Sequence, residues 1–148
     1  MFELFLVGIG TGNPEHITIQ ARRAIEEADS ILIPYKGSEK SELVDVRLKI
    51  CKEIVKGKNT KIIQFDLPSR DLSYSYQEGV EKWHDNVATV WSSTIRKNCS
   101  EDTKVAFLIW GDPSLYDSSL RIAERLKPKP KNTGICWNNI NTGFNCRT

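Results

Sequence analysis

The feature that most constrains the fold is an apolar run that ends abruptly at a Gly-Asp-Pro turn. Residues 103–110 are rich in branched and aromatic side chains, and Gly111, Asp112 and Pro113 follow directly. A helical pattern begins within a few residues of the turn. In an α/β protein such a junction is the carboxyl end of a parallel strand, where ligands bind. The chain is therefore expected to fold around buried parallel strands.

A second junction of the same kind opens the chain. Residues 2–7 are almost continuously apolar, which is typical of a strand covered on both faces. The loop that follows carries glycine at every second position, at Gly8, Gly10 and Gly12. Two glycine-marked strand ends, with strands and helices alternating between them, predict one cleft built from both loops.

The remaining sequence alternates short apolar runs with segments of helical period. Further strands are expected at residues 30–34, 61–65 and 103–110, and helices at 14–29, 41–57, 74–98 and 115–126. Asn13 is the predicted N-cap of the first helix, with Pro14 in its first turn. The order βαβαβαβα predicts an α/β fold with a parallel sheet and right-handed crossovers.

Charge and composition exclude several classes of partner. A net charge of +2, with basic and aromatic residues not interleaved on one face, gives no nucleic-acid footprint. No apolar run is long enough to span a membrane. The four cysteines, at 51, 99, 136 and 146, form no CxxC and have no histidine nearby. We therefore expect no metal site, and reduced thiols in a cytoplasmic protein.

The opening glycine loop is a poor dinucleotide fingerprint. That motif is G-x-G-x-x-G, whereas here the glycines are spaced G-x-G-x-G. The acidic residue expected at the end of the second strand is also missing, because that strand ends Ile33-Pro34-Tyr35-Lys36. An NAD-dependent oxidoreductase is therefore disfavoured. The glycines still indicate either a plain tight turn or a close approach of the backbone to a ligand.

The polar residues near the strand ends leave alternatives open. Asp112 either contacts a ligand or caps the following helix. Arg70 and Asp71 either face the cleft or form an exposed ion pair. His16 is expected on the surface and His84 is expected to face solvent. We find no Ser-His-Asp order, no paired catalytic carboxylates and no P-loop.

Several segments together carry a family resemblance that the glycine loop alone would not. The sequence resembles the tetrapyrrole (corrin/porphyrin) methylases at residues 7–18, 33–40, 65–71, 79–84 and 110–118. The resemblance covers residues 1 to about 127. It implies the N-terminal domain of a two-domain α/β enzyme in which the methyl donor lies in a cleft between the domains.

The resemblance implies a methyltransferase that uses S-adenosylmethionine. Within the family it is closest to members of cobalamin biosynthesis that methylate C-1 of precorrin-5 and release the acetyl group as acetate. A homodimer is implied as well. Another member of the family, acting on a different tetrapyrrole, an RNA or a protein, is the second interpretation, although residues 36–40 and 83–84 argue against it. An inactive or ligand-binding-only fragment is the third.

The same resemblance assigns roles to residues. The implied methyl-donor contacts are Trp110, Gly111, Asp112, Leu115 and Tyr116. The implied tetrapyrrole contacts are Gly8, Gly10, Thr11, Gly12, Asn13, Pro14, Lys36 and Arg70. Because the donor sulfonium is already activated, catalysis mainly requires alignment and placement of charge, which agrees with the missing nucleophile motif. Release of acetate needs a water and a base, for which Asp112, Asp71 and His16 are unranked candidates.

The C-terminal tail departs from the pattern. Residues 1–130 are expected to form the N-terminal domain. Residues 131–148 show neither a period of two nor one of 3.6, so we expect no strand there and a poorly ordered segment. The family continues at this point with a strand and a loop of the type P/A-G-I-T-S-x-Q-A-L. Back-translated and read one base later, the tail allows A-G-I-T-S-I-Q-A-L, with the glycine forced.

Our hypothesis is that residues from about 131 onward are read in a shifted frame, so that the second domain is absent from this chain. Resequencing the locus tests it. We expect one inserted or deleted base near codon 131, with an open downstream reading that restores the family loop. An unambiguous gene in one frame, with no such downstream reading, would contradict the hypothesis.

Overall fold

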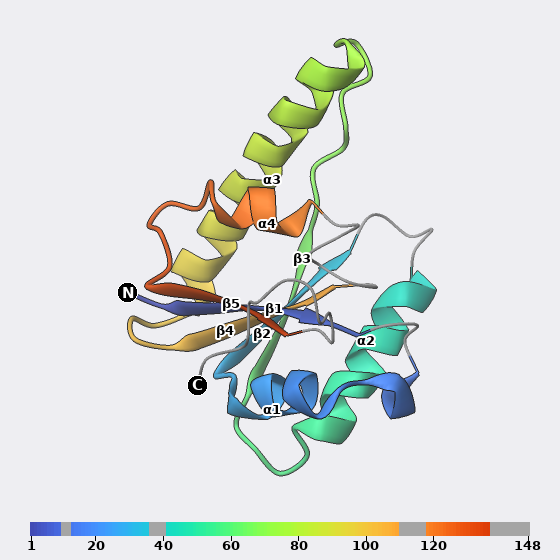
Figure 1. Ribbon diagram of the computed structural model, residues 1–148, viewed down its shortest axis with the longest axis vertical. Coiled ribbons are helices and arrows are strands. Elements are labelled where there is room, and N and C mark those ends of the chain that lie inside the picture. Colours follow the sequence, from blue (N-terminus) through green and yellow to red (C-terminus); the bar gives the residue numbers. More distant parts are fainter. Residues whose placement is uncertain (10–12, 36–40, 110–117, 137–148) are drawn as a thin grey trace.

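The structure, a computed structural model, describes residues 1–9, 13–35, 41–109 and 118–136. Its centre is a five-stranded parallel sheet in the order β3-β2-β4-β1-β5 (Figure 1). The strands are β1 (Glu3–Gly8), β2 (Ser30–Tyr35), β3 (Lys61–Asp66), β4 (Lys104–Ile109) and β5 (Asn132–Cys136). The expected α/β fold with a parallel sheet and interleaved helices is confirmed.

Helices cover both faces of the sheet. On one face lie α1 (Ile19–Glu27) and α2 (Ser41–Ile54), and on the other lie α3 (Tyr76–Asn98) and α4 (Ser119–Ala123) (Figure 1). This two-sided burial explains why β1, β2 and β4 are nearly continuous apolar runs. No helix within the described ranges is long and apolar enough to cross a bilayer.

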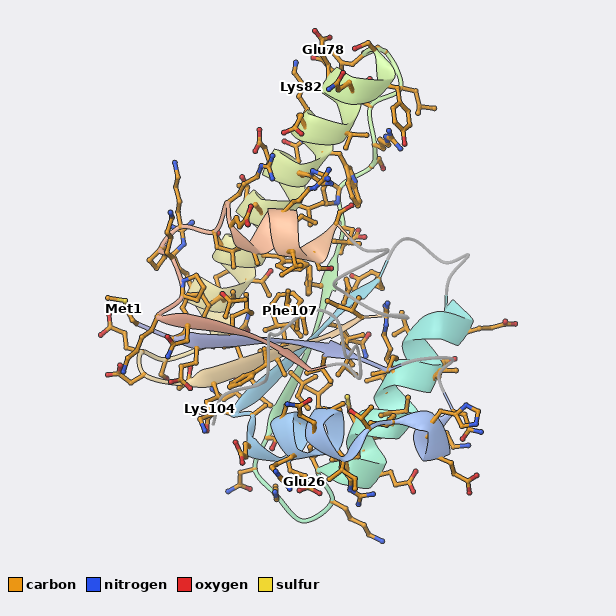
Figure 2. The ribbon with its side chains drawn as sticks, in the orientation of Figure 1. Met1, Glu26, Glu78, Lys82, Lys104 and Phe107 are labelled. Atoms are coloured by element: carbon orange, nitrogen blue, oxygen red, sulfur yellow. The ribbon has the colours of Figure 1, made fainter. Side chains whose placement is uncertain are left out.

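The core beneath α3 is built around Phe107 of β4, whose ring lies between the helix and the sheet (Figure 2). Trp91 of α3 stacks on this ring with centroids 3.9 Å apart. Phe65 of β3 meets it edge-on at 5.9 Å. Three elements far apart in the sequence are thus held together by one aromatic cluster, whose large rings bury much apolar area.

The core on the other face contains Cys51 of α2, which is fully buried. Burial raises the pKa of its thiol to about 12, despite the nearby Arg47. A thiol in this state is neither a nucleophile nor a metal ligand. The part of the chain that the structure describes also contains no group of three or more histidine, cysteine or acidic side chains arranged to hold a metal.

The helix α3 extends well beyond the sheet at its N-terminal end, where Glu78 and Lys82 lie (Figure 2). Apolar side chains are exposed there: Leu72 is 85% and Tyr76 81% accessible. The ammonium of Lys82 lies 3.5 Å from the centre of the Tyr74 ring, a cation–π contact.

The first helical segment differs from the expectation. Asn13 does act as an N-cap, its side-chain oxygen accepting from the Glu15 amide at 3.0 Å, but the 3-10 helix η1 (Pro14–His16) that it caps is only one turn long. The backbone is extended at Ile17 and Thr18. α1 then starts afresh, because the Thr18 hydroxyl accepts from the Ala21 amide at 3.0 Å.

The helix expected at 115–126 is also shorter, at least within the described residues. α4 ends at Ala123, and the chain continues in tight turns in which the Arg125 amide bonds Ile122 and the Leu126 amide bonds Ala123. Pro128 follows two residues later and cannot continue a helix. Residues 115–117 lie outside the described part.

The expectation that no strand follows residue 131 is wrong. β5 pairs in parallel with β1 from Asn132 opposite Glu3 to Cys136 opposite Val7. One more hydrogen bond precedes this pairing: the Lys131 amide donates to the Phe2 carbonyl at 2.8 Å. Backbone pairing at a sheet edge does not require side-chain alternation, so a segment without that period can still form a strand. Residues 137–148 lie outside the described part.

The expectation that His84 faces solvent is also wrong. It is 1% exposed and lies on the α3 stripe that also carries Ala88 and Trp91 toward the sheet. Neither ring nitrogen has a hydrogen-bond partner within the described residues. Desolvation lowers the pKa of the His84 imidazole, and the positive charge of Arg125 lowers it further.

Truncation of the central aromatic ring tests the core. Phe107→Ala should reduce the free energy of unfolding by about 3–5 kcal/mol, because a large buried ring is lost and Trp91 is left against a cavity. Urea denaturation measures the change. Leu72→Ala is the control, since that side chain is 85% exposed, and it should change stability by no more than about 0.5 kcal/mol. Similar losses in the two variants would contradict the packing described.

The buried imidazole should make stability depend on pH. In the unfolded chain a histidine takes up a proton as the pH falls through about 6.5, whereas the folded chain resists protonation of His84 until lower pH. The free energy of unfolding should therefore fall between pH 7.5 and 5.5, and His84→Gln should reduce that fall.

Urea denaturation at the two pH values, with His16→Gln alongside, measures how much each of the two histidines contributes. An unchanged pH dependence in His84→Gln would show that the imidazole is not held neutral.

Candidate functional site

The candidate site lies where two neighbouring strands send their connections to opposite faces of the sheet. β1 and β4 are adjacent, with Gly8 in register with Ile109, and the Ile9 amide donates to the Ile109 carbonyl at 2.9 Å. The chain leaving β1 leads to α1 on one face, and the chain leaving β4 leads to α4 on the other (Figure 1). Such a switch point leaves a crevice outside the strand ends, where α/β proteins bind ligands.

Many of the residues predicted for the site lie outside the described part of the chain. All the predicted methyl-donor contacts do so: Trp110, Gly111, Asp112, Leu115 and Tyr116. So do four of the predicted tetrapyrrole contacts: Gly10, Thr11, Gly12 and Lys36. The structure describes the strand ends from which these segments leave, and it describes the other predicted residues.

The described residues of the first junction lie on the α1 side of the switch point. Gly8 is buried as the last residue of β1. Asn13 and Pro14 are exposed at the start of η1, and His16 is exposed at its end. The predicted tetrapyrrole contacts that the structure describes here, and one of the candidate bases, are therefore grouped around one strand end.

The structure does not bring Arg70 and Asp71 to that strand end. They follow β3, which is one of the two edge strands and is separated from β1 by β2 and β4, about 14 Å at the usual strand spacing. The Arg70 guanidinium lies 5.1 Å from the centre of the Tyr76 ring. Asp71 is exposed and accepts from the Ser73 amide at 2.9 Å, and hydrogen bonds from Ser73 lower the pKa of its carboxyl.

Within the described residues, Arg70 and Asp71 make no ion pair with each other. The exposed-pair interpretation is thus not supported, although both residues do follow the carboxyl end of a strand.

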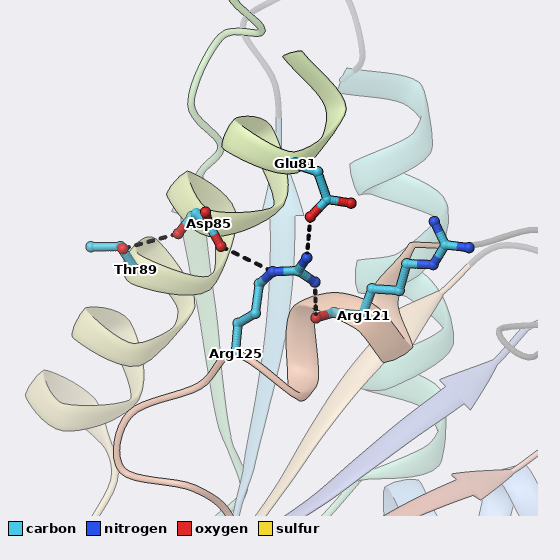
Figure 3. Close-up of polar contacts among 5 residues, drawn as sticks. All are labelled: Glu81, Asp85, Thr89, Arg121 and Arg125. Carbon is cyan, nitrogen blue, oxygen red and sulfur yellow. Dashed lines mark hydrogen bonds and ion pairs between the residues drawn. The ribbon is translucent and has the colours of Figure 1, made fainter. Parts of the chain in front are cut away.

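On the other side of the switch point, Arg125 holds the segment after α4 against α3 (Figure 3). Its guanidinium contacts the Glu81 carboxylate at 2.5 Å and the Asp85 carboxylate at 2.9 Å. It also donates to the Arg121 carbonyl at 2.7 Å. The forked guanidinium matches this arrangement, which a lysine would not reproduce. The element that follows the Gly-Asp-Pro turn is thereby fixed in position relative to α3.

His84 is next to Asp85 of this cluster in the sequence, and its side chain is buried. Its helical spacing to Ala88 and Trp91 places it on the face of α3 that packs on the sheet.

A helical stripe in the sequence could have revealed this burial. His84, Ala88, Trp91 and Ile95 follow one another at spacings of four, three and four, which places them on one helix face. Three of the four are apolar, so the face is buried and the histidine with it.

The chain matches the sequence profile of the tetrapyrrole (corrin/porphyrin) methylases over residues 3–134. It is 42% identical to a precorrin-6A synthase (deacetylating) of Sinorhizobium over 87% of its own length and 50% of that protein. It is 25% identical to a cobalt-precorrin-2 C(20)-methyltransferase of Methanocaldococcus jannaschii, over 86% of its length and 48% of that protein.

The fold agrees with these matches. The crystal structure of a cobalamin synthesis related protein (CobF) from Corynebacterium diphtheriae superposes with a TM-score of 0.67 and 34% sequence identity. The superposition covers 92% of this chain and 52% of that one. The chain thus spans about half the length of the relatives it matches. From the match over residues 3–134 we conclude that this chain belongs to the tetrapyrrole (corrin/porphyrin) methylase family.

Proposed function

We propose that this chain belongs to a cytoplasmic S-adenosylmethionine-dependent methyltransferase of cobalamin biosynthesis. The reaction is methylation of C-1 of precorrin-5 with release of acetate. The observation that carries the proposal is the 42% identity to a precorrin-6A synthase (deacetylating), which extends over 87% of the chain. A homodimer is proposed as the assembly.

The methyl donor is proposed to bind at the turn that follows β4, through Trp110, Gly111, Asp112, Leu115 and Tyr116. Two described features support this assignment. The turn leaves the sheet at the switch point beside β1, where α/β proteins bind ligands. The element after it is fixed by Arg125, and a ligand site gains from such rigid support.

The tetrapyrrole is proposed to contact the first junction, through Gly8, Gly10, Thr11, Gly12, Asn13 and Pro14, with Lys36 after β2. The exposure of Asn13 and Pro14 beside the buried end of β1 is consistent with this role. Arg70 is the weakest member of the set. It follows the edge strand β3 and already lies against Tyr76, so it would have to reach across two strands.

The chemistry requires little covalent work from the protein. When bound, S-adenosylmethionine supplies a methyl group that is already activated on a sulfonium. The residues of the chain have to align the ring carbon with that group and exclude water, which is catalysis by proximity and orientation.

Release of acetate needs a base for water. Among the candidates, Asp71 is disfavoured, because its lowered pKa makes it a weaker base and it lies three strands from β1. Asp112 and His16 remain as candidates. Asp112 belongs to the Gly-Asp-Pro turn, and His16 follows the glycine loop of the first junction.

Isothermal titration calorimetry with S-adenosylhomocysteine tests the proposal. We expect wild type to bind with a dissociation constant in the micromolar range. Asp112→Asn should weaken binding by about tenfold or more, because a charged hydrogen-bond acceptor is lost. Asp66→Asn is the matched control, since Asp66 is an exposed aspartate at the carboxyl end of the edge strand, and it should leave the dissociation constant unchanged.

Circular dichroism should first establish that each protein is folded. Folded wild-type protein that fails to bind S-adenosylhomocysteine would overturn the proposal and favour a fragment without ligand-binding function. Equal weakening by the two aspartate substitutions would overturn the assignment of the donor loop.

A further inference from the structure

The N-terminal end of α3 and the loop before it form an ordered unit that extends beyond the sheet (Figure 1). Ser75 caps the helix through its side chain. At Gly79 the loop lies so close that a Cβ would meet the Asp71 carbonyl oxygen at 3.5 Å and the Tyr74 Cβ at 3.7 Å. Loop and helix are therefore packed against each other. We call this unit, residues 70–82, the α3 tip.

The α3 tip exposes apolar side chains close together. Leu72 is 85%, Tyr74 40% and Tyr76 81% accessible, and the three lie within five consecutive residues. Together they present on the order of 400 Å² to solvent. A patch of this size is about as large as the largest on a typical monomer, and such patches commonly mark interaction sites. The ordered tip therefore has the character of a surface that a partner covers.

Two cations hold the tyrosine rings of the tip in place. The Arg70 guanidinium lies 5.1 Å from the centre of the Tyr76 ring, and the Lys82 ammonium lies 3.5 Å from the centre of the Tyr74 ring. A ring that is already fixed loses little conformational freedom when it binds. Tyrosine and arginine are also enriched at protein–protein interfaces. The partner indicated is therefore another protein surface.

The charges of the α3 tip indicate which protein surface that is. Two cations and two carboxylates balance there: Arg70, Lys82, Asp71 and Glu78. The further carboxylate of Glu81 is paired within the fold. A balanced surface does not favour a strongly acidic or strongly basic partner. A second copy of this chain carries both signs, and a two-fold axis can oppose each charge to its opposite.

A shallow hollow on the same end of the helix adds shape to this match. It has a volume of about 360 Å³ and is lined by Gln77, Glu78, Glu81 and Lys82. Its walls are mainly the aliphatic parts of these side chains. Such a hollow is large enough to take a tyrosine ring. In a two-fold pair each copy presents both an exposed ring and a hollow, which is the self-complementarity that the interface of such a dimer requires.

We propose that the α3 tip is the surface through which two copies of this chain associate as a two-fold dimer. The inference rests on the proposed function, which includes a homodimer, and assigns that homodimer a surface. The remaining half of the relatives' length is a less suitable occupant. The chain continues from β5, whereas the tip follows β3, and these strands are the two opposite edges of the sheet.

The area of the patch sets the strength of the dimer. Interfaces are slightly more than half apolar, so an apolar centre on the order of 400 Å² belongs to an interface of roughly 700 Å² per copy. That area lies just below the standard value of about 800 Å². We therefore expect a micromolar dimer that dissociates on dilution. At submicromolar concentrations the chain is a monomer, in which Leu72 remains exposed and contributes little to the free energy of unfolding.

Sedimentation velocity of the 148-residue chain, from nanomolar to high micromolar concentration, tests the inference. Wild type should change from the monomer mass to twice that mass. Leu72→Ser and Tyr76→Ser should each weaken the dimer tenfold or more, because each removes apolar contact from both halves of a two-fold interface. Ile19→Ser is the matched control: that side chain is 77% exposed on α1, on the opposite face of the sheet, and its loss should leave the dimer unchanged.

A dimer that persists undiminished in both tip variants would overturn the inference while leaving the homodimer standing. Equal weakening by Ile19→Ser would overturn it as well, since the association would then be non-specific. Wild type that stays monomeric would overturn both the surface and the homodimer. Binding of S-adenosylhomocysteine is measured separately, so the methyltransferase assignment stands or fails on its own.

A measurement on the wild-type protein covers the case in which a tip variant fails to fold. In NMR spectra of tyrosine-labelled protein, the ring resonances of Tyr74 and Tyr76 should shift as the protein concentration rises, whereas those of Tyr35, at the end of β2, should stay constant. Resonances of Tyr74 and Tyr76 that do not change with concentration would overturn the inference.

Discussion

The pairing of β1 with β4 is the constraint on which the rest of the structure depends. These two strands lie in the inner part of the sheet and are paired from Glu3 to Gly8. Their pairing joins segments that are about a hundred residues apart in the sequence. Because their connections leave to opposite faces, the two paired strands form both the centre of the core and the switch point at which α/β proteins bind ligands. The scaffold and the candidate site thus have the same physical origin.

The sequence was sufficient to predict most of this scaffold. Residues 2–7, 30–34 and 103–109 carry nearly continuous apolar runs because both faces of their strands are covered. Their short length and the turn residues that follow them favour strands over helices. Helix boundaries were harder to predict. Asn13 and Thr18 are both good caps, and only the tertiary structure decides that a short turn follows the first and α1 follows the second. β5 was missed because an edge strand is held by its backbone, which leaves little trace in side-chain pattern.

The site was less accessible to sequence reasoning. The spacing of glycines indicates where the backbone turns tightly or approaches a ligand. It does not indicate which strand ends are neighbours, because the order of strands in the sheet decides this. Arg70 illustrates the limit, since it follows a strand as the other predicted residues do, yet that strand lies at the edge. His84 illustrates the converse, because its polar residue type favours solvent whereas its helical spacing places it on the buried face.

The part of α3 that extends beyond the sheet has a consequence for local opening of the fold and for amide hydrogen exchange. A helix of 23 residues is about 34 Å long, whereas a six-residue strand covers about 20 Å, so part of the helix has no sheet beneath it. Amides near Tyr76 then exchange with solvent through fraying of the free end, while those around Trp91 exchange only when the aromatic core opens.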